Sequence, residues 1–572
     1  MTNKGDQMSE RFDTRDAAWP LRPWIMAAIC AVAGLILDGL VDFSTNLPAT
    51  SLRQAAAAFV AVAAVSFVIV VEQRRWWWAL GFALGWGVIV ALIGWFTAGY
   101  NQRHEIFEFP FLSGVFAVLL AAPLFQTVRD EGAWQFPYAR LHGHAWTDAV
   151  IGAASLAFVG ITFLLAWLIA GLFDLIGIDA IKDLLRQSWF GWTLAGFAFG
   201  AAVGLLRERD ALVGTLQRLV MVVLGVLAPV LAVALALFLL SIPFTGLGKL
   251  WDSAIPATPL MLVAGAGAIL LANAVIGNGT DERATSRVLR GSAMALVLCV
   301  LPLAVIAALS LGQRVGQYGW TPERIWGLVA VAVAIAYGVA GYWAAARRRD
   351  AFDDALRPLQ TKLAIALCGL ALVLALPIVD FGAISARSQL ARLADGRTPA
   401  DKFDWQAMAF DFGPAGRAKL QAMAQGGRPD QRRLAAAALA ATRRYQVNEE
   451  IAVAATASTL PDRLRVLPDA RMLTPPLRRA IAATRYCHTG RCLAAKIDDR
   501  RWLLVGSFGN EPLQRVLIER QNDGSWAEVE EWQQAPRSGT PASDLGTARV
   551  EIREVRRRQL MVNGEPVGRA FE

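Results

Sequence analysis

Charged residues are scarce in this chain. Only 18% of its 572 residues are Asp, Glu, Lys or Arg, whereas 55% are hydrophobic, and the mean hydropathy is +0.41. This composition leaves too little polar surface for a soluble protein, so we expect lipid to be the main solvent of the fold. A net charge of +9 alone would suggest nucleic acid. However, the basic residues lie between apolar runs, which indicates anionic lipid and membrane topology instead.

Residues that build common catalytic and metal sites are equally rare. The chain has four histidines, and it contains no HExxH zinc motif, Walker A loop, GxSxG elbow or dinucleotide-binding glycine pattern. His142 and His144 form an HxH pair in a predicted loop, without an obvious third ligand beside them. The sequence therefore predicts no cofactor, no metal site and no catalytic residue, and it gives no reason to expect nucleic acid as a partner.

The five cysteines fall into two groups. Cys30, Cys299 and Cys368 stand singly inside apolar runs, where we interpret them as small hydrophobic residues. Cys487 and Cys492 close a short loop that contains a glycine. A disulfide is the favoured interpretation of this pair, and it would suit an oxidising compartment; free thiols and a metal site that uses the intervening histidine are the alternatives.

Long apolar runs are the main positive feature of the sequence. A helix needs about 20 apolar residues to cross the hydrocarbon core of a bilayer, and eleven runs of about that length follow one another before residue 380. The predicted fold class is therefore a polytopic α-helical membrane protein with about eleven transmembrane helices and a C-terminal extramembrane α+β domain. The predicted spans are residues 23–41, 55–71, 76–97, 110–128, 149–176, 190–206, 219–240, 259–276, 291–310, 325–346 and 363–379.

The basic residues predict the orientation of these spans. About 19 Lys and Arg residues flank the spans on the side of the N-terminus, and about seven lie on the other side. Basic residues in short loops stay in the cytoplasm, so we expect the N-terminus inside and the C-terminal domain in the periplasm of a bacterial inner membrane. Residues 1–22 carry acidic residues and no cleavage site, which indicates a retained cytoplasmic tail rather than a signal peptide.

The chain after residue 380 has a different pattern. We expect a periplasmic helical segment over residues 381–474 and a periplasmic β-rich domain over residues 475–572, where the hydrophobic period changes to two. Helices are predicted at residues 387–395, 414–425 and 428–442. Strands are predicted at residues 492–497, 502–506, 515–519, 526–532, 548–555 and 559–562.

Small residues at regular spacing mark positions where helices can pack closely. Two glycine faces predict close helix packing within one bundle: Gly196, Gly200 and Gly204 form one, and Gly81 and Gly85 form the other.

Asp38, Asp174 and Asn273 are the polar residues inside predicted spans that we consider as candidates for a functional role. Asp38 and Asp174 are near span ends, where an interfacial carboxylate is the simplest interpretation. Asn273 is enclosed by apolar neighbours, so we expect an interhelical hydrogen bond there rather than a transport site.

Polar residues concentrate on the predicted outer face, in the loop at residues 314–324 and after the last span at residues 385–393. Because both segments leave the membrane on one face, we expect them to fold against each other. Their arginines, hydroxyls and amides could bind an anionic lipid headgroup or an envelope polymer, whereas the alternative is a solvated face that docks the outer segment on the bundle. The candidate ligand-binding residues, which we call the arginine surface, are Arg314, Tyr318, Thr321, Arg324, Ser388, Gln389 and Arg392.

Several stretches together carry a resemblance to a known family. They are FPYARLHGHAW at 136–146, LFDLIGI at 172–178, IPFTGL at 242–247, and the segments 314–324 and 385–393. With these stretches the chain resembles a bacterial family of multi-spanning membrane proteins catalogued as domain of unknown function forty-one fifty-three. The resemblance implies an integral inner-membrane protein. The family has no established activity, so it assigns no catalytic residue.

Two functional hypotheses remain open at this stage. The favoured one is a non-enzymatic envelope protein that displays a periplasmic sensing or interaction domain. The rival is a transporter or a lipid-linked envelope enzyme whose outer pocket contains Arg314, Arg324, Arg387 and Arg392; the absence of an internal repeat disfavours transport. The lipid bilayer is the expected partner, and the sequence identifies no protein partner, substrate or oligomeric state.

Overall fold

The computed structural model of the chain consists of two compact units, residues 1–419 and 420–572. It describes residues 19–41, 51–73, 75–101, 108–248, 256–279, 284–348, 351–400, 402–484, 487, 491–506, 514–529, 558–562 and 565–571. The domain boundaries expected from the sequence, at residues 381 and 475, stay predictions, and each unit is described here by itself.

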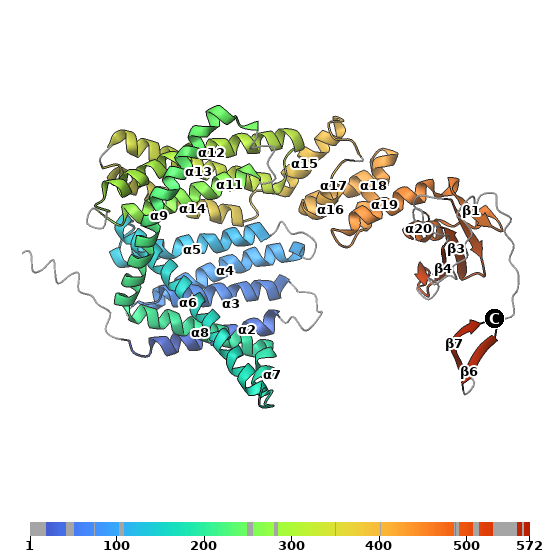
Figure 1. The fold of residues 1–572 in the computed structure, drawn as a ribbon, viewed down its shortest axis with the longest axis horizontal. Helices are drawn as coiled ribbons and strands as arrows, with labels where there is room; N and C mark the ends of the chain where they lie inside the picture. The colour runs from blue at the N-terminus through green and yellow to red at the C-terminus, as the bar shows by residue number, and fades with distance from the viewer. Residues whose placement is uncertain are drawn as a thin grey trace, which may run out of the picture. The chain divides into compact units, whose positions relative to one another are not determined.

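Long helices make up the first unit (Figure 1). Eleven helices in the described part of the chain are long and apolar enough to cross a membrane, which confirms the predicted fold class. In lipid, a helix satisfies its own backbone hydrogen bonds, and this is why such runs become helices. The helices are α2 (Arg22–Val41), α3 (Ser51–Val70), α4 (Trp76–Asn101), α5 (Glu108–Glu131), α6 (Tyr138–Asp174), α8 (Ser188–Glu208), α9 (Asp210–Thr245), α11 (Ala257–Ile276), α12 (Arg287–Tyr318), α13 (Pro322–Arg347) and α14 (Phe352–Ala375).

Some of these helices extend beyond the predicted spans. Helix α6 begins at Tyr138, after the extended Pro137, so the prediction that His142 and His144 lie in a loop is wrong. Helix α12 continues to Tyr318, so the first part of the expected loop at 314–324 is helical. An apolar run locates only the part of a helix in the hydrocarbon, whereas backbone hydrogen bonds continue the helix into polar sequence.

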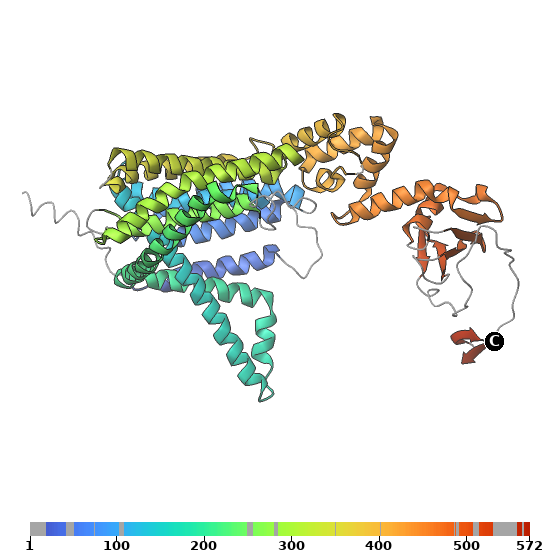
Figure 2. The same cartoon turned by 45° about the horizontal axis from the view of Figure 1, so that its top comes forward.

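The end of α6 extends away from the rest of the bundle, and the short helix α7 (Ala180–Arg186) connects it to α8, as Figures 1 and 2 show. At this end Lys182 Nζ lies 2.8 Å from Asp174 Oδ2, so the interfacial carboxylate predicted from the sequence has a cation beside it. A side-chain hydrogen bond with Asp174 raises the pKa of the Asp179 carboxyl.

Several apolar cores hold the described part of the first unit together. One includes residues of α2, α3 and α8, such as Met26 and Val203, another includes residues of α11 and α12, such as Ala268 and Leu296, and a smaller one includes Val90 of α4. Many other large apolar side chains on the long helices are exposed, as expected of surfaces that face lipid.

Glycines allow α2 and α8 to approach closely. An added Cβ would lie 2.1 Å from Cys30 O at Gly196 and 2.2 Å from Met26 O at Gly200, so this predicted glycine face does pack helices within one bundle. The second predicted face is wrong. At Gly81 and Gly85 an added Cβ would meet nothing within 4 Å, because that side of α4 is exposed.

The first unit continues through α15 (Phe381–Ala394) and α16 (Trp405–Phe410), and α17 (Gly413–Gly426) contains the boundary between the units. Asp380 caps α15, since its Oδ1 accepts a hydrogen bond of 2.8 Å from the Ala383 amide. This cap places the start of α15 earlier than the predicted residue 387.

The second unit combines helices with a five-stranded sheet of order β1-β2-β3-β4-β5, in which β1 is parallel to β2 and the other pairs are antiparallel. Its helices are α18 (Pro429–Ala440), α19 (Gln446–Thr459) and α20 (Pro475–Ala483). The strands are β1 (Leu464–Leu467), β2 (Cys492–Lys496), β3 (Arg501–Gly506), β4 (Gln514–Arg520) and β5 (Trp526–Val529), with a separate hairpin of β6 (Arg558–Val562) and β7 (Glu565–Phe571).

Alternation along the strands builds the core of this sheet. Trp502 and Leu504 of β3 and Val516 and Ile518 of β4 are buried, because every second side chain of a strand points to the same face. The predicted strands at 492–497, 502–506, 515–519 and 559–562 are present within a residue or so at each end. The predicted strand at 548–555 lies outside the described residues.

Cys487 and Cys492 are paired in a disulfide, with their Cα atoms 5.8 Å apart, and both are buried in the core of the second unit. Cys30, Cys299 and Cys368 are free thiols on helices of the first unit.

Candidate functional site

The arginine surface forms where the end of α12 meets α15. Gln389 Nε2 donates hydrogen bonds to Tyr318 O at 2.8 Å and to Trp320 O at 3.0 Å. Arg392 donates to Gly316 O at 3.1 Å and also to Gln317 O. The prediction that these two segments fold against each other is therefore confirmed.

These contacts explain how α12 ends. The last carbonyls of a helix have no partner within it, and here side chains of α15 supply donors to them. Gly319 follows with φ of +78°, and its carbonyl accepts a hydrogen bond of 2.6 Å from Arg324. The Trp320 amide donates to Ser388 Oγ at 3.2 Å. Several polar side chains of the arginine surface thus form hydrogen bonds with backbone atoms of residues 316–320.

The ring of Tyr318 lies beside two cations of the arginine surface. The guanidinium carbons of Arg314 and Arg324 lie 6.0 and 5.6 Å from the centre of its ring, within reach of a cation–π attraction. Thr321 precedes α13 and makes no side-chain cap. Glu323 is the acidic group that acts electrostatically on Arg324. A role of these residues in binding an anionic ligand stays a prediction.

Replacing Gln389 with alanine should lower the free energy of unfolding by about 1 to 3 kcal/mol, because it leaves the half-buried carbonyls of Tyr318 and Trp320 without their donor. Gln389 is only 9% exposed. Thermal unfolding of the purified protein in detergent would measure the loss. The control is Arg387→Ala on the exposed side of the same helix, and an equal loss in that variant would contradict the capping role.

A small cavity near the arginine surface does not include its cations. It has a volume of about 170 Å³ and lies between α4, α5, α13, α14 and α15. Its polar lining in the described part of the chain comes from Thr97 and Asp380, and neither Arg314 nor Gln389 reaches it.

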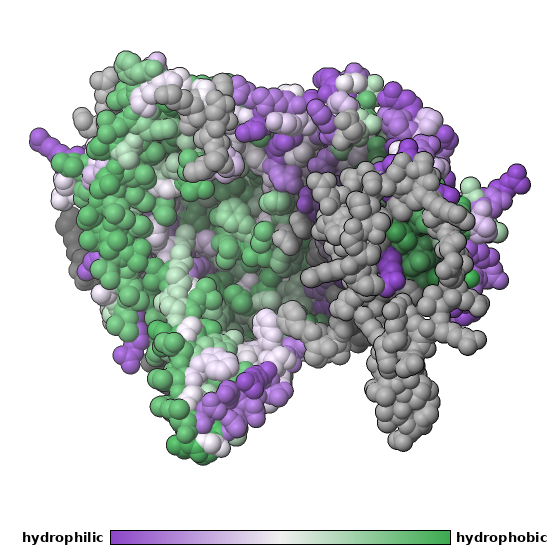
Figure 3. Space-filling model, turned by 45° about the vertical axis from the view of Figure 1, so that its right-hand side comes forward, coloured by the Kyte–Doolittle hydropathy of each residue, from purple (hydrophilic) through white to green (hydrophobic). Residues whose placement is uncertain are grey.

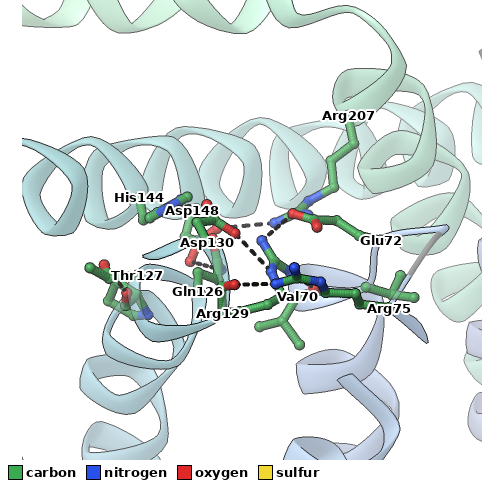
Figure 4. A network of polar contacts seen from close by, with 12 residues as sticks. Val70, Glu72, Arg75, Gln126, Thr127, Arg129, Asp130, His144, Asp148 and Arg207 are labelled. Atoms are coloured by element: carbon green, nitrogen blue, oxygen red, sulfur yellow. Dashed lines mark hydrogen bonds and ion pairs between the residues drawn. The ribbon is translucent and has the colours of Figure 1, made fainter. Parts of the chain in front are cut away.

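A second polar cluster lies at the other ends of the helices (Figure 4). We call it the polar network, and its members are Glu72, Arg75, Gln126, Arg129, Asp130, His144, Asp148 and Arg207. They come from the end of α3, the start of α4, the end of α5, the start of α6 and the end of α8.

Arg129 is at the centre of the polar network. Its side chain is 2% exposed; it pairs with Glu72, lies 2.9 Å from Asp130 Oδ1 and donates to Val70 O at 2.6 Å. His144 Nε2 lies 2.9 Å from Asp130 Oδ2, which extends the network to α6. Arg129 thus links α5 to the end of α3 directly, and it links α5 to α6 through Asp130 and His144.

Asp148 joins a further helix to this network. Its two carboxylate oxygens contact Gln126 Nε2 at 2.6 Å and Arg207 at 3.3 Å, so α5, α6 and α8 meet at one carboxylate. From α2, Arg22 donates to Val71 O at 2.8 Å. Sequence reasoning used Arg22, Arg129 and Arg207 only as topology signals and missed the network. Gln126, a polar residue inside the predicted span 110–128, was the available signal.

The family profile described as "Domain of unknown function (DUF4153)" matches residues 56–411. The chain belongs to this family. No curated protein and no solved structure matches it.

The DUF4153 region contains both polar clusters but not the whole chain. It begins within α3 and ends just after α16, so the arginine surface and all members of the polar network fall inside it. Helix α2 and the second unit lie outside. Among the described residues of this DUF4153 protein, no group of three or more His, Cys, Asp or Glu side chains could hold a metal ion.

Proposed function

We propose that this protein is a non-enzymatic component of the bacterial inner membrane, with its N-terminus in the cytoplasm and its second unit in the periplasm as a sensing or interaction domain. The distribution of Lys and Arg carries the proposal. About 19 of them flank the spans on the N-terminal side and about seven on the other, and such residues are retained in the cytoplasm. Eleven crossings put the two termini on opposite sides.

The disulfide supports a periplasmic second unit. Disulfides persist in oxidising compartments and are rare in the cytosol. Cys487 and Cys492 lie in that unit, whereas Cys30, Cys299 and Cys368 on the membrane helices are free.

Structural roles of the polar clusters support a protein that is not an enzyme. Gln389 and Arg392 cap a helix, and Arg129 and Asp148 tie helix ends together. The rival, a transporter or lipid-linked enzyme with an arginine-rich outer pocket, would need a cavity bordered by Arg314 or Arg392. The cavity between α4, α5, α13, α14 and α15 is bordered by neither.

Reporter fusions test the orientation. Alkaline phosphatase fused after Glu572 should be active and green fluorescent protein fused there should be dark, since the first needs the periplasm and the second the cytoplasm. Fusions after Arg348, between α13 and α14, are the matched control and should give the opposite pattern. A fluorescent green fluorescent protein and an inactive alkaline phosphatase at Glu572 would overturn the proposal. The disulfide would then no longer support a periplasmic second unit.

A further inference from the structure

A large apolar cavity opens between helices of the first unit. Its volume is about 860 Å³, and it lies among α5, α6, α11, α13 and α14. Figure 3 shows that one face of the molecule is hollowed and that hydrophobic residues predominate there. The volume is within the range of pockets that hold small molecules. Apolar side chains that line an empty space lose packing contacts, so we expect an apolar molecule to occupy a cavity of this size.

The length of the cavity fits a lipid chain. On α14 its lining extends from Gln360 to Leu374. At 1.5 Å per helical residue this corresponds to about 21 Å, which is enough for an acyl chain that spans one half of a bilayer core about 30 Å thick. The described lining includes Leu262, Val333 and Leu367, and it contains no Asp, Glu, Lys or Arg.

One end of the cavity is polar. Gln360 is 8% exposed, and its Nε2 donates to Asn273 Oδ1 at 2.7 Å, which confirms the interhelical hydrogen bond predicted for Asn273. The second amide atom, Gln360 Oε1, is buried and has no hydrogen-bond partner among the described residues. The Tyr138 hydroxyl is likewise buried and has no hydrogen-bond partner among the described residues. Both Gln360 and Tyr138 line the cavity.

His142 holds this polar end in place. Its ring stacks on Tyr138 with centres 5.1 Å apart, and its Nε2 accepts a hydrogen bond of 3.0 Å from Trp146 Nε1. Its Nδ1 contacts Asn278 Oδ1. An imidazole that accepts at Nε2 carries its proton at Nδ1, so His142 is neutral and brings no charge of its own to this end.

We propose that this cavity binds an uncharged, hydroxyl-bearing membrane lipid of the diacylglycerol class. The acyl chains fill the space between α11, α13 and α14, and the hydroxyl donates to Gln360 Oε1 and accepts from the Tyr138 hydroxyl. Buried polar atoms without partners lose free energy, and a hydroxyl supplies the donor that Gln360 Oε1 lacks. A phosphate headgroup would bring acceptors only, to a lining without cations.

Native mass spectrometry of the full chain in detergent, with dioleoylglycerol added, tests the proposal. Tyr138→Phe removes only the unpartnered hydroxyl, so it should keep the fold and weaken binding about three- to tenfold. Gly265→Leu should abolish binding or weaken it by about tenfold or more, because Gly265 lines the cavity and an added Cβ meets nothing within 4 Å. Gly160→Leu, on an exposed face of α6, is the matched control and should bind as the unaltered protein does.

Dioleoyl phosphatidic acid distinguishes a specific site from lipid that adheres anywhere. The proposal expects dioleoylglycerol to be retained at least about tenfold more strongly than phosphatidic acid with the same chains. Equal retention of the two lipids would identify non-specific annular lipid and overturn the proposal. Unchanged binding in Gly265→Leu would do the same.

Discussion

Replacing Arg129 with methionine is expected to lower the free energy of unfolding by about 3 to 5 kcal/mol, the usual cost of removing one partner from a buried ion pair. The guanidinium is 2% exposed and contacts Glu72, Asp130 and the Val70 carbonyl. Methionine has a similar length but no charge and no donor, so two carboxylates lose a shared cation and a carbonyl loses its hydrogen bond. Thermal and chemical unfolding in detergent would measure the change.

Arg186→Met is the matched control for this experiment. Arg186 is 62% exposed and lies 3.7 Å from Asp183, so its loss should change stability by less than about 1 kcal/mol. Arg129→Lys keeps the charge and should recover part of the stability. If Arg129→Met were no more harmful than Arg186→Met, the polar network would not hold the helix ends together.

Hydrophobicity alone was enough to predict the membrane helices. Each of the eleven runs is long enough to cross a bilayer, and each became a helix because lipid offers no other partner for the backbone. Helix ends were harder to predict. Residues 138–148 of α6 are polar and were expected to form a loop, yet they continue the helix and carry His144 and Asp148 into the polar network.

The arginine surface and the polar network differ in how far the sequence could reveal them. The meeting of α12 and α15 was predicted from topology, because both segments were expected to leave the membrane on one face, and the hydrogen bonds of Gln389 show that they do meet. The polar network joins Glu72, Arg129, Asp148 and Arg207, which are far apart in sequence and whose pairing depends on helix packing. No local pattern encodes that pairing.

Strands with distant partners were missed for the same reason. β1 is only four residues long and pairs in parallel with β2, whose partner residues are about 28 positions away along the chain. Its short apolar pattern resembles part of a helix, so the segment was expected to be helical. The cavity between α11, α13 and α14 could not be predicted at all, because it depends on where side chains fail to meet.

The close approach of α2 and α8 depends on glycines of α8, and this dependence can be tested. We expect Gly196→Ala combined with Gly200→Ala to lower the free energy of unfolding by about 2 to 6 kcal/mol, at about 1 to 3 kcal/mol for each overpacked position. The added Cβ atoms would lie 2.1 and 2.2 Å from backbone oxygens of α2. Neither oxygen can move without its helix, so α2 and α8 must separate.

The same substitution at Gly85 separates this effect from any general effect of alanine. An added Cβ at Gly85 meets nothing within 4 Å, and alanine favours a helix by about 1 kcal/mol relative to glycine, so Gly85→Ala should be neutral or slightly stabilising. Opposite signs for one chemical change at two positions would show that contact with α2 determines the outcome. Unfolding curves in detergent for the double variant and for Gly85→Ala provide the comparison, and coincident curves would mean that α2 and α8 do not pack through Gly196 and Gly200.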